Sequence, residues 1–166
     1  MLERWQGEPL VRRAAQTFLE ARLAPVIVVV SPDPELLDAL AGLAIGHVVN
    51  PHPERGISSS IAIGVQAVPE ECVAATIGVA DQPYLTAGAL SELIQAFAPG
   101  RIAVPRYGDH RGNPAVFDRR FFPELQTLAG DRGGQGVIEA HPEAVTEIGL
   151  PPMMGEDIDR PEQWPS

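Results

Sequence analysis

The sequence contains no lysine. Its 12 basic residues are all arginine, and they stand against 22 acidic residues, which gives a formal net charge of −10 over 166 residues. This excess of negative charge argues against nucleic acid or an anionic membrane surface as a partner. Because lysine is absent, any phosphate group that the protein binds must be held by arginine, by backbone amides or by a metal ion.

Cysteine and long apolar runs are also scarce. The single cysteine, Cys72, excludes an internal disulfide and is expected to be a small packed residue beside a strand. The first ten residues hold no apolar signal core, and no apolar run approaches the length of a membrane span. We therefore expect a soluble cytoplasmic protein that forms one domain over residues 1–166.

Short apolar runs alternate along the chain with amphipathic stretches, which is typical of an α/β protein with a mostly parallel sheet. Arg12 and Arg13 lie on the polar face of the first expected helix, so we expect them to be solvated. The expected strands cover residues 26–30, 48–49, 73–80, 102–104, 115–117 and 145–148. The expected helices cover residues 9–23, 34–42, 61–68, 86–97, 119–128, 135–140 and 159–163.

The longest apolar run, residues 73–80, stops at Asp81-Gln82-Pro83. A strand without polar alternation is expected to be buried on both faces, and ligands gather at the carboxyl ends of such strands. Pro83 cannot continue the strand, so the carboxylate of Asp81 is predicted to lie on the rim of the sheet as a metal ligand. The alternative is that Asp81 caps the next helix, although Thr86 is better placed for that role.

A second acidic motif lies near the end of the chain, where Asp157 and Asp159 fall on the same side of an extended segment. Paired acids are typical of a Mg²⁺ site only where another carboxylate converges with them, and Asp81 is the candidate.

Three polar loops complete the set of motifs. Gly56 precedes three serines, Ser58-Ser59-Ser60, at the start of an expected helix, whose free amides suit an anion. On this signal alone, a role of the serines as simple helix caps is favoured over ligand binding. Arg111-Gly112-Asn113-Pro114 forms a polar turn, and the loop 130–134 places Arg132 before another helix.

Taken in order, these motifs resemble the molybdenum cofactor cytidylyltransferases, within the wider molybdopterin nucleotidyltransferase group. The resemblance covers essentially the whole chain, and DQP followed by DID-x-PE at this separation is its most specific part. The matching residues are Leu2, Trp5, Gly7, Pro9, Leu10, Val49-Asn50-Pro51, Gly56, Ser58-Ser59-Ser60, Gly64, Asp81-Gln82-Pro83, Gly112-Asn113-Pro114, Gly130-Asp131-Arg132-Gly133 and Asp157-Ile158-Asp159-Arg160-Pro161-Glu162.

The resemblance implies a Rossmann-like, three-layer nucleotidyltransferase fold and transfer of CMP from CTP to the phosphate of molybdopterin, with release of pyrophosphate. It implies Mg²⁺ held by Asp81, Asp159 and Asp157, the first two being catalytic, because Mg²⁺ favours carboxylate oxygens. Gly56, the three serines and Asp81 would bind the nucleotide. The acceptor would be bound by Arg111, Asn113 and Arg132. A molybdoenzyme or its maturation factor is the implied protein partner.

The family begins with a strand and a glycine-rich loop whose Arg and Lys hold the triphosphate, whereas this sequence starts about where the residue after that Lys is expected. The resemblance thus implies an N-terminally truncated domain that lacks the first strand and the loop. Three explanations are open: a start codon placed too late, neighbouring strands that close up or pair with another chain, or an inactive copy. We favour the first, and we expect the chain as printed to bind CTP weakly and to turn over poorly or not at all.

Three alternative functions remain open. The enzyme could use GTP or another acceptor, because the loop that helps to choose the base is missing. A sugar-nucleotide glycosyltransferase also holds a metal with Asp-x-Asp, but that pair normally follows a central strand. A non-catalytic nucleotide-binding or partner-binding remnant of the same fold is the third alternative.

Overall fold

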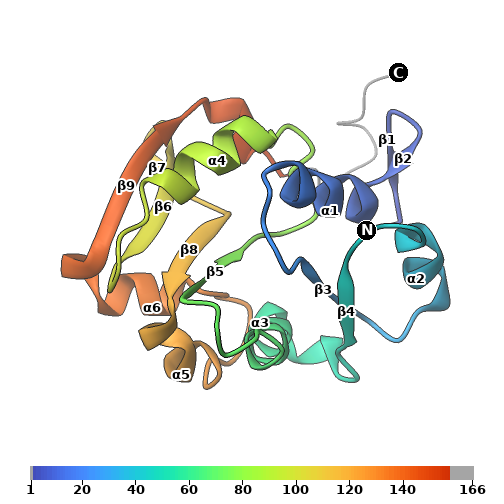
Figure 1. Ribbon diagram of the computed structural model, residues 1–166, viewed down its shortest axis with the longest axis horizontal. Coiled ribbons are helices and arrows are strands. Elements are labelled where there is room, and N and C mark those ends of the chain that lie inside the picture. Colours follow the sequence, from blue (N-terminus) through green and yellow to red (C-terminus); the bar gives the residue numbers. More distant parts are fainter. Residues whose placement is uncertain (1, 158–166) are drawn as a thin grey trace.

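The computed structural model of the protein describes residues 2–157 (Figure 1). No helix in this part of the chain is long and apolar enough to cross a membrane. The strands are β1 (Arg4–Trp5), β2 (Glu8–Pro9), β3 (Ile27–Val30), β4 (Gly46–Val49), β5 (Ala74–Ile77), β6 (Ile102–Tyr107), β7 (His110–Arg111), β8 (Ala115–Asp118) and β9 (Val145–Leu150). The α-helices are α1 (Leu10–Glu20), α2 (Pro34–Leu40), α3 (Ile57–Gln66), α4 (Ala87–Gln95), α5 (Phe122–Leu125) and α6 (Gln135–Ala140). Short 3₁₀ turns are η1 (Pro53–Arg55), η2 (Arg119–Phe121), η3 (Pro142–Ala144) and η4 (Pro152–Gly155).

Two helices begin where local capping predicts. The Asp33 side chain accepts a hydrogen bond from the amide of Glu35 at 3.0 Å, with proline at the first position of α2. The Thr86 hydroxyl accepts one from the amide of Ala89 at 3.2 Å and starts α4. Thr86, and not Asp81, is therefore the cap of the helix after the DQP motif. The expected last helical turn, residues 159–163, lies outside the described residues.

The strands form a mixed sheet arrangement and not the mostly parallel one expected. β3 and β4 pair in parallel as a separate two-stranded sheet, and β1 and β2 form a small antiparallel hairpin. In the five-stranded sheet the order is β5-β8-β6-β7, and β9 also pairs with β6. β8 runs antiparallel to both β5 and β6, whereas β9 is parallel to β6. The short path from β6 through β7 to β8 leaves no room for a crossover helix, so β8 must run antiparallel.

Helices cover the strands on both sides, as expected for a three-layer α/β fold (Figure 1). Along β6, Ile102 and Val104 enter a cluster with side chains of α3, α5 and α6. Ala103, between them, faces the opposite way and packs against Leu90 and Leu93 of α4.

Two helices, one on each face, connect the separate sheets. On one face, α1 places Val11 against β3 and Phe18 against the cluster of α4, β6 and β8. On the other face, α3 buries Ile61 and Val65 against the five-stranded sheet, while a Cβ on its Gly64 would lie 3.0 Å from a methyl group of Val29 in β3. The two sheets therefore share one layer, although no strand pairing joins them within residues 2–157.

The central apolar run is shorter and less buried than expected. Residues 73–80 were predicted to form a strand buried on both faces, but β5 covers only Ala74–Ile77, and all four of its residues are half-buried. Val73 is 71% exposed. The reason is that β5 pairs with β8 on one edge, and no strand of the described chain pairs with its other edge.

Candidate functional site

The serine motif and the 130–134 loop, far apart in the sequence, lie in contact. Gly56 ends η1 with a φ of +86°, and a Cβ on it would collide with the carboxylate of Asp131 and lie 2.7 Å from the carbonyl oxygen of Gly130. The backbone amide of Ser58 donates a hydrogen bond to that same carbonyl oxygen of Gly130 at 3.1 Å. Only glycine fits at position 56, so this close approach links the two motifs into one surface.

Asn50, which directly follows β4, holds the serines in place and was not predicted as a site residue. Its Nδ2 donates to the hydroxyl of Ser59 at 2.8 Å and to that of Ser60 at 3.0 Å. Its Oδ1 accepts from the amide of His52 at 2.9 Å, and the residue is only 1% exposed. An Asn-Pro pair directly after a strand end was the sequence signal that marked this position.

Ser58 differs from its two neighbours. Its side chain is completely buried, and its hydroxyl oxygen has no hydrogen-bond partner among the described residues. Ser59, in contrast, is half-buried and donates its hydroxyl proton to the carbonyl of Gly56 at 2.8 Å. Buried polar atoms are normally hydrogen-bonded, so an unpartnered hydroxyl inside a candidate site requires an explanation.

The DQP turn lies beyond β5. Asp81 is half-buried and is separated from the end of β5 by residues 78–80, so it does not directly follow the strand as predicted. One of its carboxylate oxygens is buried, and so is Oε1 of Gln82, which has no hydrogen-bond partner among residues 2–157. Nε of Arg13 in α1 donates to the carbonyl of Pro83 at 2.8 Å. Arg13 therefore holds this turn in place. The expectation that it would be solvated, based on its position on the polar face of the helix, was wrong.

Arg12 is likewise engaged with the protein and not simply solvated. It donates to the carbonyl oxygens of Ala39 and Ala41, both at 2.9 Å, at the end of α2. It therefore closes the end of a helix whose last carbonyl groups lack helical partners.

Asn113 and Asp157 both lie near Tyr107, the last residue of β6. The Tyr107 hydroxyl donates to the carbonyl oxygen of Asn113 at 2.7 Å, while the Asn113 residue itself is exposed. Burial, with a smaller contribution from the Asp157 carboxylate, raises the pKa of Tyr107 to about 12. The phenol consequently keeps its proton at neutral pH and remains a hydrogen-bond donor.

The two arginines predicted to bind the acceptor are paired with carboxylates. Nε of Arg111 donates to Glu147 in β9 at 2.6 Å, and Arg106 donates to the other oxygen of the same carboxylate at 3.3 Å. Hydrogen bonds from Arg111 and then Arg106 lower the pKa of Glu147. Arg132 forms an ion pair with Glu139 of α6. All three arginine side chains are largely exposed.

The predicted metal ligands fit a divalent cation by their chemistry. Asp81 and Asp157 offer hard carboxylate oxygens of the kind that Mg²⁺ and Mn²⁺ prefer, and the Asp81 carboxylate is partly enclosed at the rim of the fold. Asp159, the other predicted catalytic acid, lies outside the described residues. Within the described range, no group of three or more His, Cys, Asp or Glu side chains is arranged to hold a metal ion. The metal site therefore stays a prediction.

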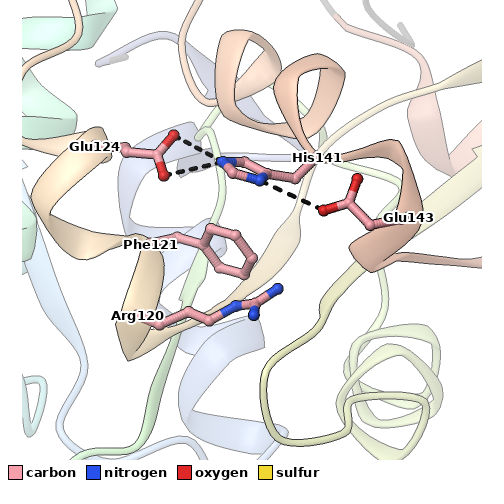
Figure 2. A pocket seen from close by; sticks show the side chains of 5 residues that line it. All are labelled: Arg120, Phe121, Glu124, His141 and Glu143. Carbon is pink, nitrogen blue, oxygen red and sulfur yellow. Dashed lines mark hydrogen bonds and ion pairs between the residues drawn. The ribbon is translucent and has the colours of Figure 1, made fainter.

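A separate pocket of about 260 Å³ contains none of the predicted site residues (Figure 2). Figure 2 shows His141 between two carboxylates: Nε2 lies 2.9 Å from both oxygens of Glu124, and Nδ1 lies 3.6 Å from Glu143. Phe121 packs against the imidazole, and Arg120 lies over the ring of Phe121 at 4.5 Å. These side chains pair mainly with one another, which is typical of a structural cluster.

A family model for the MobA-like NTP transferase domain matches residues 1–145 of the sequence. The chain belongs to the MobA-like NTP transferase domain family. This match covers most of the chain and includes the serine, DQP, Asn113 and Arg132 motifs. It confirms the family that those motifs indicated. The activity typical of this domain is nucleotidyl transfer. The nucleotide base, the acceptor and the metal remain predictions.

Individual relatives of this MobA-like protein are distant. The nicotine blue oxidoreductase of Paenarthrobacter nicotinovorans is 28% identical over 96% of this chain and 82% of its own length. The crystal structure of Rv0371c from Mycobacterium tuberculosis H37Rv superposes with a TM-score of 0.84 at 23% identity, over 95% of this chain and 82% of that one. A nucleotidyl transferase from Methanothermobacter also gives 0.84, at 17% identity, over 95% of this chain and 78% of that one. At these identities the two structures show the fold.

Proposed function

We propose that this MobA-like protein transfers CMP from CTP to the phosphate of a molybdopterin-type acceptor and releases pyrophosphate. The observation that carries the proposal is the position of two buried polar atoms without partners among the described residues, Ser58 Oγ and Gln82 Oε1. Each belongs to a motif predicted from the sequence to face the nucleotide or its metal. Such atoms cost free energy when left unpaired. Because both atoms are enclosed by the fold, a bound nucleotide would pair with them only if the surrounding loops move on binding.

In the proposed reaction, a phosphate oxygen of the acceptor attacks the α-phosphorus of the nucleotide, and the bond from that phosphorus to the oxygen bridging to the β-phosphate breaks. The pyrophosphate leaves with that oxygen. Such a transfer depends mainly on positioning and charge neutralisation. Gly56 would let the 130–134 loop lie directly against the serine motif that binds the nucleotide, and Asn50 would keep the hydroxyl groups of Ser59 and Ser60 in a fixed orientation.

A divalent cation would be held by Asp81 and by the acids of the last motif, Asp157 and Asp159. When bound, it would neutralise charge on the phosphate oxygens. Support comes from a second crystal structure of Rv0371c, in complex with manganese, which superposes on this chain with a TM-score of 0.75 and 21% identity over its own alignment. We therefore expect Mg²⁺ or Mn²⁺ to serve.

The choice of CTP is supported by a neighbour of the same fold. The CMP:2-keto-3-deoxy-manno-octonic acid synthetase, crystallised with CTP, superposes with a TM-score of 0.72 at 12% identity. Among the predicted acceptor contacts, the exposed Asn113 needs no rearrangement. Arg111 and Arg132 would reach an acceptor only by leaving Glu147 and Glu139, and an anionic acceptor would compete with those carboxylates.

The deciding experiment measures pyrophosphate release from CTP, GTP, ATP and UTP with molybdopterin and either Mg²⁺ or Mn²⁺. We expect little or no turnover by the 166-residue chain itself and, in a version that also carries the family's N-terminal strand and loop, more turnover with CTP than with the other nucleotides. Turnover with GTP and with no other nucleotide would show that the enzyme transfers GMP and not CMP. Calorimetric titration of the 166-residue chain with CTP and Mg²⁺ tests the expected weak binding; micromolar affinity would show that the family's glycine-rich loop is dispensable.

In a version that includes the family's N-terminal strand and loop, Asp81→Asn should lower the metal-dependent turnover about a hundredfold or more and leave the fold intact, because it removes a charged ligand from the proposed metal ion. Asp38→Asn, on the exposed face of α2, is the matched control and should leave turnover unchanged. Near-normal activity of the Asp81 variant would make Asp81 only a turn residue. A milder loss for Asp159→Asn than for Asp157→Asn would assign the second ligand to Asp157.

A second candidate function follows from the relative that is named an oxidoreductase. The nicotine blue oxidoreductase matches 96% of this chain, so redox chemistry on the same scaffold is a specific alternative. Incubation with nicotine blue and a reduced nicotinamide or flavin tests it by loss of the dye colour. Bleaching without any pyrophosphate release from nucleotides would favour the redox function.

A further inference from the structure

Three chain segments that carry candidate site residues meet at one side chain, Tyr107. This residue ends β6 and is 1% exposed. The segments are the loop with Asn113, the segment from β9 through η4 to Asp157, and the start of α4 just after the DQP turn. None of these segments is adjacent to another in the sequence.

Two glycines let the backbone lie directly against the Tyr107 ring. A Cβ on Gly112 would lie 2.9 Å from both Cδ2 and Cε2 of the ring. A Cβ on Gly155 would lie 2.5 Å from Cγ and 2.8 Å from Cε2. Because carbon atoms in van der Waals contact are about 3.5–4.0 Å apart, neither position accepts a larger residue without movement. One glycine directly precedes Asn113, and the other lies two residues before Asp157.

The remaining contacts of the ring and its hydroxyl extend the arrangement to the DQP turn. The hydroxyl donates to the carbonyl of Asn113 at 2.7 Å. Leu85, just before α4, and Ala89, in its first turn, form one buried cluster with Tyr107. The amide of Leu85 also donates to the carbonyl of Gln82 at 3.2 Å, which ties this cluster to the DQP turn.

We propose that Tyr107 is a positioning residue of the transfer reaction, which holds the Asn113 loop, the Asp157 segment and the DQP turn in one fixed arrangement. This inference rests on the proposed function for its consequence in catalysis. Tyr107 does not touch the reacting atoms in this proposal. Its effect comes through placement, and a misplacement of about 1 Å at a reacting centre can lower the rate about a hundredfold.

The test compares Tyr107→Phe with Tyr84→Phe, which removes the hydroxyl of a tyrosine that packs edge-on against Trp5 and not against this cluster. Tyr107→Phe should lower kcat about three- to tenfold, the effect of one lost hydrogen bond, with the KM for the nucleotide unchanged. Hydrogen exchange should accelerate by a similar factor in residues 108–114, with the core of α6 unchanged. Tyr84→Phe should change neither quantity.

A second pair of variants tests the ring contacts. Gly155→Ala inserts a methyl group against the ring and should accelerate exchange in residues 151–157 and lower kcat further than Tyr107→Phe does. Gly149→Ala is the matched control, because a Cβ at this strand position meets nothing within 4 Å. Wild-type kcat together with wild-type exchange in both Tyr107→Phe and Gly155→Ala overturns the proposal. If the wild-type chain shows no transfer with any nucleotide, as the missing triphosphate loop would cause, the exchange measurements decide whether Tyr107 holds these segments. If a version that also carries the family's N-terminal strand and loop shows no transfer either, the proposed function fails, and the exchange result still stands.

Discussion

β6 and β3 are strands of similar apolar character in very different surroundings. Ile102, Ala103 and Val104 of β6 are completely buried, and β6 pairs with β8 and β7 as well as with β9. β3 consists of one isoleucine and three valines, but only Val30 is buried, and β3 pairs with β4 alone. β5 resembles β3, because it too has one paired edge and half-buried residues throughout.

The difference shows that apolar composition does not by itself decide burial. The side chains of a strand are shielded by neighbours on both edges and by helices on both faces, and β3 and β5 lack one of those neighbours among the described residues. The helices α1 and α3, which contact both sheets, connect the two parts. The site residues are divided in the same way: Asn50 follows β4, while Tyr107 and Asn113 belong to the five-stranded sheet.

The largest expected effect is on stability and compares the two sheets directly. Phe117→Ala removes a ring that is 1% exposed in the main core and should lower the free energy of unfolding by about 3–5 kcal/mol. Val29→Ala in the half-buried β3 should lower it by about 1 kcal/mol. Urea denaturation of both variants measures the difference, and equal losses would show that β3 is packed as tightly as β8.

An intermediate effect is expected at Asn50, which connects the end of β4 to the start of α3. Asn50→Ala removes two hydrogen bonds to serine hydroxyl groups and should lower the free energy of unfolding by about 1–3 kcal/mol. Asn113→Ala, an exposed side chain whose carbonyl still accepts from Tyr107, is the control and should change stability by less than about 0.5 kcal/mol. Thermal unfolding of the two variants makes the comparison. If Asn50→Ala lowers the free energy of unfolding by less than its control does, the hydrogen bonds of Asn50 to the serines do not stabilise the fold.

The smallest effect concerns Glu147, which joins β9 to Arg106 and Arg111. Because hydrogen bonds from these arginines lower the pKa of Glu147 from 4.5, its ionised form is favoured in the folded protein. This contribution is complete above pH 4.5 and is lost as the pH falls through the lowered pKa. The three side chains are exposed, so the loss should be below about 1 kcal/mol. In urea titrations between pH 3 and pH 6, about the range of carboxylate titration, Glu147→Gln should abolish this part of the pH dependence of the free energy of unfolding. If the pH dependence is the same in the variant as in the wild type, other carboxylates are responsible for it.

Local chemistry made parts of the fold predictable. Asp33 and Thr86 cap their helices as expected, and α6 covers the predicted residues 135–140, because capping and helical periodicity depend on neighbours within a few positions. The expected helix over residues 119–128 instead divides into η2 and α5. Helix ends of this kind depend on tertiary contacts as well as on local pattern.

Long-range partners account for what the sequence did not reveal. Nothing near Arg13 in the sequence indicates that it donates to Pro83, and nothing near Arg111 indicates Glu147 as its partner. The contact of Gly56 with Asp131 is another example, since a glycine required by a distant loop resembles any other turn glycine.

The sequence by itself determined the family, the α/β class and the motifs expected to carry the chemistry, because these depend on residue types and their order along the chain. Only the tertiary structure decided that β8 runs antiparallel, that β3 and β5 are half-buried, and that Tyr107 gathers three distant segments around one ring. The physical reason is that strand direction, burial and such contacts depend on which residues meet in space. Short apolar runs can pair in several ways, and the choice between them belongs to the fold as a whole.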